Sequence, residues 1–412
     1  MVTYHTPLDL VRERSPERPV ALVRPDAVAL AARWFQDNFK GDVLYAVKAN
    51  PSPWVIKALW EAGSRGFDVA SLNEIELVAR MAPGATMAFM HPVKSRNAIA
   101  RAYADYGVRT FSLDTHEELA KILDATGGAR DLNLIVRLAV TTEGAAYSLS
   151  GKFGVGPHEA PSLLLAARQA TDELMGVSFH VGSQCMRPSA YQAAMAQASR
   201  ALVRAGVFAD VVDVGGGFPS VYPGMVPPPL SDYMDAIHRS FEEMKVHETT
   251  ELWCEPGRAL VAESSSLLAK VELRKGDALY LNDGSYGSLF DAAHTKWPFP
   301  AKMVRDGEAS SELKPFRFYG PTCDSLDHMP GPFWLPEDVN EGDYVEIGML
   351  GAYGVAMTTG FNGYGETDTA EVADGPMASM FGLGPRSIPT RRVEESSVVK
   401  LSSRRNKRRK RR

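Results

Sequence analysis

The chain has 412 residues, longer than one ordinary hydrophobic core, and this length predicts about two domains. Hydrophobic residues make up 45% and charged residues 23%, a balance typical of soluble globular proteins that argues against a fibrous or disordered chain. No stretch approaches the roughly 18 apolar residues of a membrane span, and the charged N-terminus does not resemble a signal peptide. Three scattered cysteines without metal-type spacing exclude a disulfide framework and a zinc site, so we expect no metal and a cytoplasmic protein.

The net charge of −5 hides an asymmetry along the chain. Residues Arg404–Arg412 hold eight Lys and Arg side chains, and without them the net charge is near −13. An acidic body argues against nucleic acid as the main partner and favours a small cationic substrate. The basic tail is judged separately: it could bind nucleic acid or an anionic surface, or be a remnant of the reading frame.

Eight short apolar runs alternate with helical patterns over about 230 residues. The runs are nearly continuous rather than alternating, which favours parallel strands buried on both faces. Eight strand–helix units predict a (β/α)8 barrel of the TIM type. The expected strands are Val43–Val47, Gly66–Val69, Met87–Met90, Arg109–Leu113, Leu132–Val140, Val177–Val181, Val211–Val214 and Glu251–Cys254.

The intervening segments carry helical signals. Trp54–Ala62 and Ala190–Ala205 have helical apolar spacing. Ser71–Met81 begins with Ser71 followed three residues later by Glu74, and Thr115–Ala125 repeats the pattern. Both starts predict capping boxes.

After Glu263 the pattern changes to short strand-like pieces separated by Gly, Pro, Asp and Asn clusters, which predicts an antiparallel β domain. The clearest pieces are Leu267–Leu273, Ala278–Leu281, Phe316–Tyr319 and Tyr344–Ile347. We therefore expect a barrel over residues 20–262 and a β domain over 263–375 that residues 1–19 join. Residues 376–412 are expected to form a frayed end and a disordered basic tail.

Functional side chains of such a barrel lie at the C-terminal ends of its strands. Unusual polar residues do occur at or near the ends of the apolar runs. One such residue means little, but eight on one rim indicate a functional site. They are Lys48, Asp68, His91, Asp114, Arg137, His180, Gly215–Gly217 and Glu255.

Lys48 follows an apolar strand in YAVKAN. Loss of water there should lower the pKa of its amine and make the amine available for a Schiff base. The plainer explanation is a lysine whose amine reaches solvent at the strand end.

Three glycines, Gly215 to Gly217, follow the strand VVDV. Their backbone amides could bind a phosphate, with Arg258 of CEPGR as the counter-charge. Glu255 could hold a ring nitrogen protonated. Taken singly, each has an ordinary alternative: a tight turn, a surface ion pair, a core histidine at His180 or a loop hydroxyl at Ser183.

The β domain contributes further candidates. In PTCDSLD, Cys323 could handle protons and Asp324 could hold an ammonium. Asp291 follows Phe290, which offers an apolar wall beside a carboxylate. Tyr353 and Phe361 stand among glycines, where a ligand could approach closely. Turn residues and ordinary core aromatics are the alternatives.

Together these motifs resemble the fold-type III pyridoxal-phosphate enzymes with an alanine-racemase-like barrel, and among them the ornithine/lysine decarboxylase family. The similarity runs from about Tyr45 to Phe361. It rests on YAVKAN, GFDVAS, FSLDT, VRL, SGKFG, SFHVGSQ, DVGGGFP, CEPGR, DGSYGS, PTCDSLD and GAYG, in the family's order.

The resemblance implies a role for each matching residue. Lys48 would carry pyridoxal 5'-phosphate, His180 would stack on its ring, and Glu255 would pair with its ring nitrogen. Cys323 would govern protonation of the decarboxylated carbon, with Asp324, Asp291 and Phe361 around the substrate. The other positions implied to contact the cofactor are Asp68, Arg137, Ser183, Gly215, Gly216, Gly217, Gly257, Arg258 and Tyr353.

The resemblance also implies a homodimer whose active sites lie between subunits, with Lys152 at the interface. The implied reaction converts L-ornithine to putrescine, with some lysine activity, in polyamine biosynthesis. Two departures bear on this: Phe290 replaces a usual Tyr in a shortened segment, and the basic tail has no counterpart.

The alternatives are a lysine decarboxylase, a diaminopimelate decarboxylase, a racemase and a regulatory homologue without activity. Diaminopimelate enzymes typically have Cys-Glu where Asp324 follows Cys323 here, and a racemase would need a second base in place of this loop. A regulatory homologue would be expected to lose Lys48 or the glycine loop.

Overall fold

The computed structural model describes residues 2–141, 145–147, 151–295 and 297–383. The basic tail, Arg404–Arg412, lies outside these ranges. Within them, no helix is both long and apolar enough to cross a membrane.

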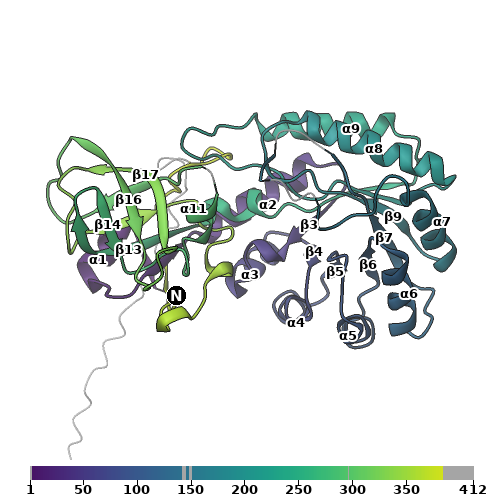
Figure 1. Ribbon diagram of the computed structural model, residues 1–412, viewed down its shortest axis with the longest axis horizontal. Coiled ribbons are helices and arrows are strands. Elements are labelled where there is room, and N and C mark those ends of the chain that lie inside the picture. Colours follow the sequence, from purple (N-terminus) through teal and green to yellow (C-terminus); the bar gives the residue numbers. More distant parts are fainter. Residues whose placement is uncertain (1, 142–144, 148–150, 296, 384–412) are drawn as a thin grey trace, which may run out of the picture.

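Eight parallel strands close into a barrel, as predicted, and every expected strand is present (Figure 1). Around the barrel their order is β11-β12-β3-β4-β5-β6-β7-β9. The strands are β3 (Asp42–Ala46), β4 (Gly66–Val69), β5 (Thr86–Phe89), β6 (Thr110–Leu113), β7 (Asn133–Arg137), β9 (Met175–Ser178), β11 (Val211–Asp213) and β12 (Glu251–Cys254).

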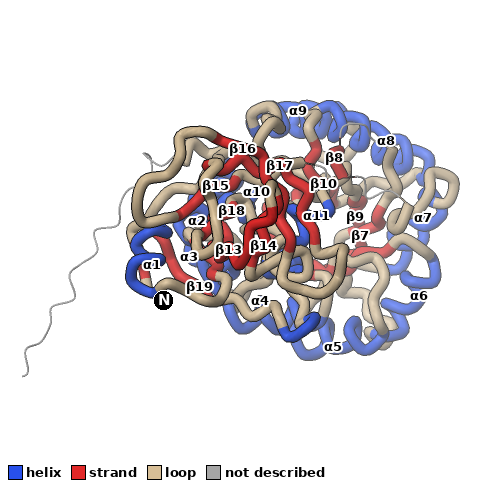
Figure 2. The backbone as a smooth tube through the Cα atoms, turned by 60° about the vertical axis from the view of Figure 1, so that its left-hand side comes forward, coloured by secondary structure: helices blue, strands red, loops and turns tan. Residues whose placement is uncertain are grey.

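Helices surround the barrel (Figures 1 and 2). Their apolar faces are buried in the core. The expected helices are confirmed, and side chains of Ser71 and Thr115 cap two of them. The helices are α2 (Pro25–Asn38), α3 (Pro53–Glu61), α4 (Leu72–Met81), α5 (Arg96–Tyr106), α6 (His116–Ala125), α7 (Ala160–Ala170), α8 (Ser189–Ala205) and α9 (Leu230–Glu243).

The two expected capping boxes are only half formed. The Glu74 carboxylate accepts a hydrogen bond from the Ala70 amide at 2.6 Å, one residue before the Ser71 cap. The Glu118 carboxylate lies beside Lys94, with Nζ 3.1 Å from Oε1. A neighbouring backbone amide at Glu74 and a tertiary ion pair at Glu118 therefore take the two carboxylates away from the bond expected in a capping box.

The second domain is a nine-stranded sheet with the expected strands β13, β14, β16 and β18. It is mixed rather than wholly antiparallel, because β2 pairs with β19 and β14 pairs with β16 in parallel. Its strands are β1 (Thr3–Tyr4), β2 (Val20–Val23), β13 (Ser265–Lys275), β14 (Ala278–Leu281), β15 (Ala301–Val304), β16 (Leu313–Tyr319), β17 (His328–Pro336), β18 (Tyr344–Ile347) and β19 (Asp368–Val372).

Both ends of the described chain contribute to this sheet (Figure 2). The N-terminal helix α1 (Pro7–Arg14) lies beside it, and β2, expected at the start of the barrel, is its strand between β19 and β13. The barrel's own elements therefore begin only after Val23. Residues 376–383, expected to be frayed, pack on the body: the Met380 amide donates to Glu263 at 2.5 Å, and the Phe381 ring lies 6.0 Å from that of Trp34.

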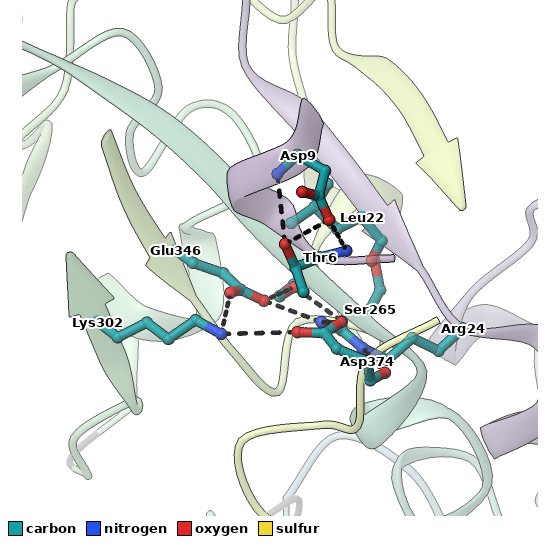
Figure 3. A network of polar contacts seen from close by, with 9 residues as sticks. Thr6, Asp9, Leu22, Arg24, Ser265, Lys302, Glu346 and Asp374 are labelled. Carbon is teal, nitrogen blue, oxygen red and sulfur yellow. Dashed lines mark hydrogen bonds and ion pairs between the residues drawn. The ribbon is translucent and has the colours of Figure 1, made fainter. Parts of the chain in front are cut away.

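A buried polar cluster joins these distant segments (Figure 3). Arg24, only 2% exposed, follows β2 and donates from Nη2 to Glu346 at 3.0 Å and to Asp374 at 2.7 Å. Its Nη1 donates to the Ser266 hydroxyl at 2.9 Å. Lys302 reaches Glu346 Oε2 at 2.7 Å. Burial alone would raise the pKa of Glu346, but Arg24 and Lys302 outweigh it and the pKa is lowered.

We predict that Arg24→Met destabilises the protein by about 3–5 kcal/mol, because it leaves Glu346 and Asp374 without their shared buried partner. Urea unfolding measures this. Arg12→Met is the control, since it breaks an exposed pair with Asp306 and should cost only about 0–1 kcal/mol. Equal effects of the two changes would contradict this view of the cluster.

Candidate active site

The barrel brings the rim residues to one end. Lys48 lies in the 3-10 turn η1 (Val47–Ala49) after β3, and its Nζ is 2.9 Å from Asp68 Oδ2 on β4. Arg137 ends β7, His180 follows β9, and Glu255 follows β12. The Glu255 amide donates to the carbonyl of Gly215 at 2.8 Å, so the loops after β11 and β12 are joined.

The expected lowering of the Lys48 pKa is wrong for this chain without a ligand. Burial does act in that direction, but the carboxylates of Asp68 and Glu255 outweigh it and raise the pKa of Lys48. The amine is therefore a protonated cation held by acids. Its use as a nucleophile requires loss of that proton.

Glu255 and Asp213 are two buried acids that interact with each other. Burial is the main cause that raises the pKa of Glu255 well above its usual range, and the neighbouring Asp213 raises it further. Burial also raises the pKa of Asp213 to about 6, although the Gly215 amide donates to its Oδ1 at 2.8 Å. Glu255 Oε1 is buried and has no hydrogen-bond partner. Such an oxygen suits a protonated ring nitrogen.

His180 is held as a neutral imidazole. Its Nδ1 accepts a hydrogen bond from the Gly182 amide at 2.9 Å, so the ring proton belongs on Nε2. Burial lowers the pKa of His180 well below its usual range, and the cations Arg137 and Lys48 lower it further. Ser183 begins β10 (Ser183–Cys185), which directly follows this turn.

The glycine loop leaves no room for side chains. A Cβ on Gly215 would lie 2.1 Å from the Phe179 carbonyl oxygen, and the backbone there has a φ of 67°. A Cβ on Gly216 would lie 2.7 Å from the Glu255 carbonyl and 3.2 Å from His180 Nε2. Within the described residues, the amides of Gly216 and Gly217 have no hydrogen-bond partner. Two free amides fit an anionic oxygen.

Arg258 lies beyond Gly257, at the start of the short helix α10 (Arg258–Val261). Its Nη1 donates to Asp291 at 2.7 Å and to the Tyr222 hydroxyl at 2.8 Å, while Nε is buried without a partner. Its guanidinium carbon is 5.0 Å from the centre of the Tyr353 ring. The Nε–H group of this buried guanidinium is therefore available to donate a hydrogen bond to a phosphate.

The Cys323–Asp324 loop lies between β16 and β17, and Cys323 is exposed. The Tyr286 hydroxyl donates to Asp324 at 2.6 Å, and the Leu326 amide donates at 3.0 Å. The Leu326 amide and then Tyr286 lower the pKa of Asp324. The ring of Phe361 lies 5.0 Å from that of Tyr286.

Two groups of expected site residues therefore remain separate in one chain. Among the described residues, no hydrogen bond or ion pair connects Cys323 or Asp324 with Lys48 or Asp291. The structure gathers Lys48, Asp68, His180 and Glu255 on the barrel, and it places Asp324 with Phe361 on the β domain.

Two other rim residues have packing roles. Asp114 accepts from the Gly154 amide at 2.8 Å, and the ring of His91 meets that of Phe153 edge-on at 5.1 Å. Both contacts hold the segment that carries Lys152, whose ammonium lies 4.9 Å from the Phe153 ring centre.

Sequence reasoning missed several contributors. Asp213 stands one residue before the end of its apolar run, a polar residue inside a strand that could have been flagged. Glu74 was assigned to a cap, yet burial raises its pKa to about 7 and Asp68 and Lys48 are among its charged neighbours. Tyr222 lies in a loop and carries no signal in the sequence, whereas Tyr286 lies within the motif DGSYGS but was not assigned a role.

Comparisons with known proteins agree on one family. A family model described as the pyridoxal-binding domain of pyridoxal-dependent decarboxylase matches residues 26–262. The lysine/ornithine decarboxylase of Selenomonas ruminantium is 34% identical over 82% of this chain and 85% of its own. The ornithine decarboxylase of Caenorhabditis elegans is 33% identical over 78% and 79%. The Paramecium bursaria Chlorella virus arginine decarboxylase, solved with agmatine, has a TM-score of 0.79 and 28% identity over 88% of this chain and 98% of its own.

We predict that Asp213→Asn stabilises the cofactor-free protein increasingly from about pH 4 to pH 6 and by a constant amount above pH 6. The folded pKa of Asp213 is about 6 and its ordinary value is 3.8, so between these pH values the unfolded chain loses a proton that the folded chain keeps, and the wild type loses stability as the pH rises. The gain at pH 8 should be as large as about 3 kcal/mol and should vanish near pH 4. Urea unfolding at both pH values tests this.

The control for that experiment is Asp37→Asn, which removes an exposed carboxylate on α2. A gain at pH 4 as large as that at pH 8, or the same gain in the control, would contradict the assignment of the effect to buried ionisation.

Proposed function

The chain belongs to the pyridoxal-dependent decarboxylases that act on basic amino acids, and on this premise we propose that it converts L-ornithine to putrescine, with slower conversion of lysine to cadaverine. These diamines would place it in polyamine biosynthesis.

The described residues fit pyridoxal phosphate, and we assign its contacts accordingly. The unpartnered Glu255 oxygen would face the ring nitrogen, and His180 would face the ring. The free amides of Gly216 and Gly217, with Arg258, would hold the phosphate. When bound, the cofactor supplies an acceptor for the electron pair left by the departing carboxylate. Lys48 is the amine we assign to covalent attachment, with Asp68 beside it, and Cys323 is the group that would return a proton to the substrate carbon.

The observation that carries the substrate proposal is the free charge of Asp324. Tyr286 and a backbone amide hold this carboxylate, and no cation among the described residues neutralises it. A substrate with a distal ammonium would supply the missing charge. A substrate without one would leave the acid unpaired, a large penalty in a closed site.

Asp291 is proposed as the second acceptor of that ammonium. In the isolated chain it is paired with Arg258. A phosphate at Arg258 would compete for the guanidinium and leave Asp291 freer to accept from the substrate. The preference for ornithine over lysine rests on one methylene, which is worth about 1–3 kcal/mol in a pocket.

We further propose a homodimer with shared active sites. Large apolar side chains are exposed near the Cys323 loop, among them Leu326 at 70% and Phe361 at 41%. A second copy seated on this face would bury them and bring Asp324 to its Lys48. Val355, Met357 and Tyr364 extend the same exposed apolar set.

The direct test is product analysis after incubation with ornithine, lysine, arginine or diaminopimelate. We expect putrescine to form fastest, cadaverine more slowly, and Lys48→Ala to form neither. Asp324→Ala should lower kcat/KM for ornithine roughly 10- to 100-fold, because it removes a charged hydrogen-bond acceptor. Asp306→Ala, an exposed acid elsewhere on the β domain, is the matched control. Faster turnover of diaminopimelate than of ornithine, or an unaffected Asp324→Ala enzyme, would refute the proposed substrate.

The shared site has its own test, the mixing of inactive Lys48→Ala subunits with Cys323→Ala subunits, which keep only a small residual turnover. After equimolar mixing, the sample should regain about a quarter of wild-type activity, because about half of the dimers are hybrids and each hybrid has one intact site of two. Subunit exchange is verified with differently tagged chains. Exchange without recovered activity would exclude a site built from both subunits.

A further inference from the structure

Asn362 makes a contact that the proposed function does not yet use. It lies in the 3-10 turn η4 (Phe361–Gly363), and its Oδ1 accepts a hydrogen bond from the Cys323 amide at 3.1 Å. Its backbone is left-handed, with a φ of 55°. That conformation disfavours most side chains, but asparagine tolerates it. Asn362 is thus held in an uncommon backbone conformation at the point where its side chain contacts the loop that carries the Cys323 thiol.

The rest of the loop is anchored by other residues. Asp327, only 1% exposed, accepts from the Ser285 amide at 2.7 Å, the Thr322 amide at 3.0 Å and the Thr322 hydroxyl at 2.7 Å. Tyr286 fixes Asp324. Within the described part of the chain, however, the hydrogen bond that the Cys323 amide donates to Asn362 is the only one made by the Cys323 backbone. The peptide next to the thiol therefore depends on one side-chain acceptor.

The segment that carries Asn362 is itself tied to the same loops. The Thr359 amide donates to the Tyr286 carbonyl at 2.8 Å, and the Phe361 and Tyr286 rings are in contact. Asn362 thus belongs to a segment that contacts Tyr286, the residue that holds the proposed ammonium acceptor Asp324. The Asn362 oxygen links this segment to the backbone amide of Cys323.

We propose that Asn362 is a positioning residue that orients Cys323 for proton delivery to the substrate carbon. This inference rests on the proposed function. Asn362 acts through the Cys323 amide rather than on the substrate itself. A proton donor must lie within hydrogen-bond reach of its target, so a loosened thiol delivers its proton in a smaller fraction of encounters. Asp324 keeps its own anchor, so substrate binding should change little.

Two substitutions separate the acceptor from the backbone conformation. Asn362→Gly keeps the left-handed turn at no steric cost but removes the acceptor. Asn362→Asp keeps an acceptor oxygen and tolerates the same turn. We expect Asn362→Gly to lower kcat about 10-fold with KM within about 2-fold, and Asn362→Asp to stay within about 3-fold of wild type.

A double-mutant cycle tests whether Asn362 acts through the thiol. Against a Cys323→Ala background, where residual turnover is followed as released carbon dioxide, Asn362→Gly should change kcat by less than about 2-fold. An equal loss in both backgrounds, or an Asn362→Asp enzyme as impaired as Asn362→Gly, would overturn the proposal.

A readout that needs no turnover is alkylation of the purified holoenzyme with iodoacetamide. Cys323 is the exposed thiol of the three, and Cys185 and Cys254 are buried. Asn362→Gly should change the alkylation rate of Cys323 at least about 3-fold, and Asn362→Asp should not. If the wild-type protein decarboxylates no basic amino acid, the proposed function is refuted, but the alkylation rate of Cys323 still tests whether Asn362 holds the Cys323 loop. If wild type is active and both variants alkylate and turn over as wild type does, the anchor alone is refuted.

Discussion

The concentration of acids around one ammonium at the barrel mouth constrains the site more than any other interaction. Asp68 pairs directly with Lys48, Glu255 also attracts the ammonium, and Asp213 is a neighbour of Glu255. Burial alone would remove the charge from each group, yet the mutual attraction keeps Lys48 protonated. A ligand that brings its own ring nitrogen and phosphate relieves this arrangement, because it gives Glu255 a donor and Arg258 an anion.

Backbone amides, rather than charged side chains, are the donors that the glycine loop offers to an anion. The glycine loop closes against the carbonyls of Phe179 and Glu255 so tightly that side chains are excluded. Only amide donors can then face an anion there. Arg258 adds a full positive charge from the next loop, held in place by Tyr222 and Asp291.

The second sheet determines what the barrel mouth meets. Its strands come from both ends of the described chain, and Arg24 joins β2, β18 and the segment after β19 through one buried guanidinium (Figure 3). Elsewhere in the same domain, the loops with Tyr286, Cys323 and Asn362 are joined by hydrogen bonds into one unit. The proposed function needs that unit to face a barrel, and in the dimer that we propose a second copy of the chain would supply one.

Local sequence determined the barrel and most of its rim. Continuous apolar runs specify buried parallel strands whatever surrounds them, and a polar residue at the end of such a run has few places to lie, which is why Lys48, His180, Glu255 and the glycine loop were identifiable. Other features depended on partners distant in the chain. Only the tertiary structure decided that β2 and β19 belong to the second sheet and that the pKa of Lys48 is raised. It also decided the pairing of Arg258 with Asp291 and the hydrogen bond that the Cys323 amide donates to Asn362. The physical reason is that hydrogen bonds and electrostatic interactions depend on distance in space. Nothing in the sequence around Arg24 indicates that folding will bring Glu346 next to it.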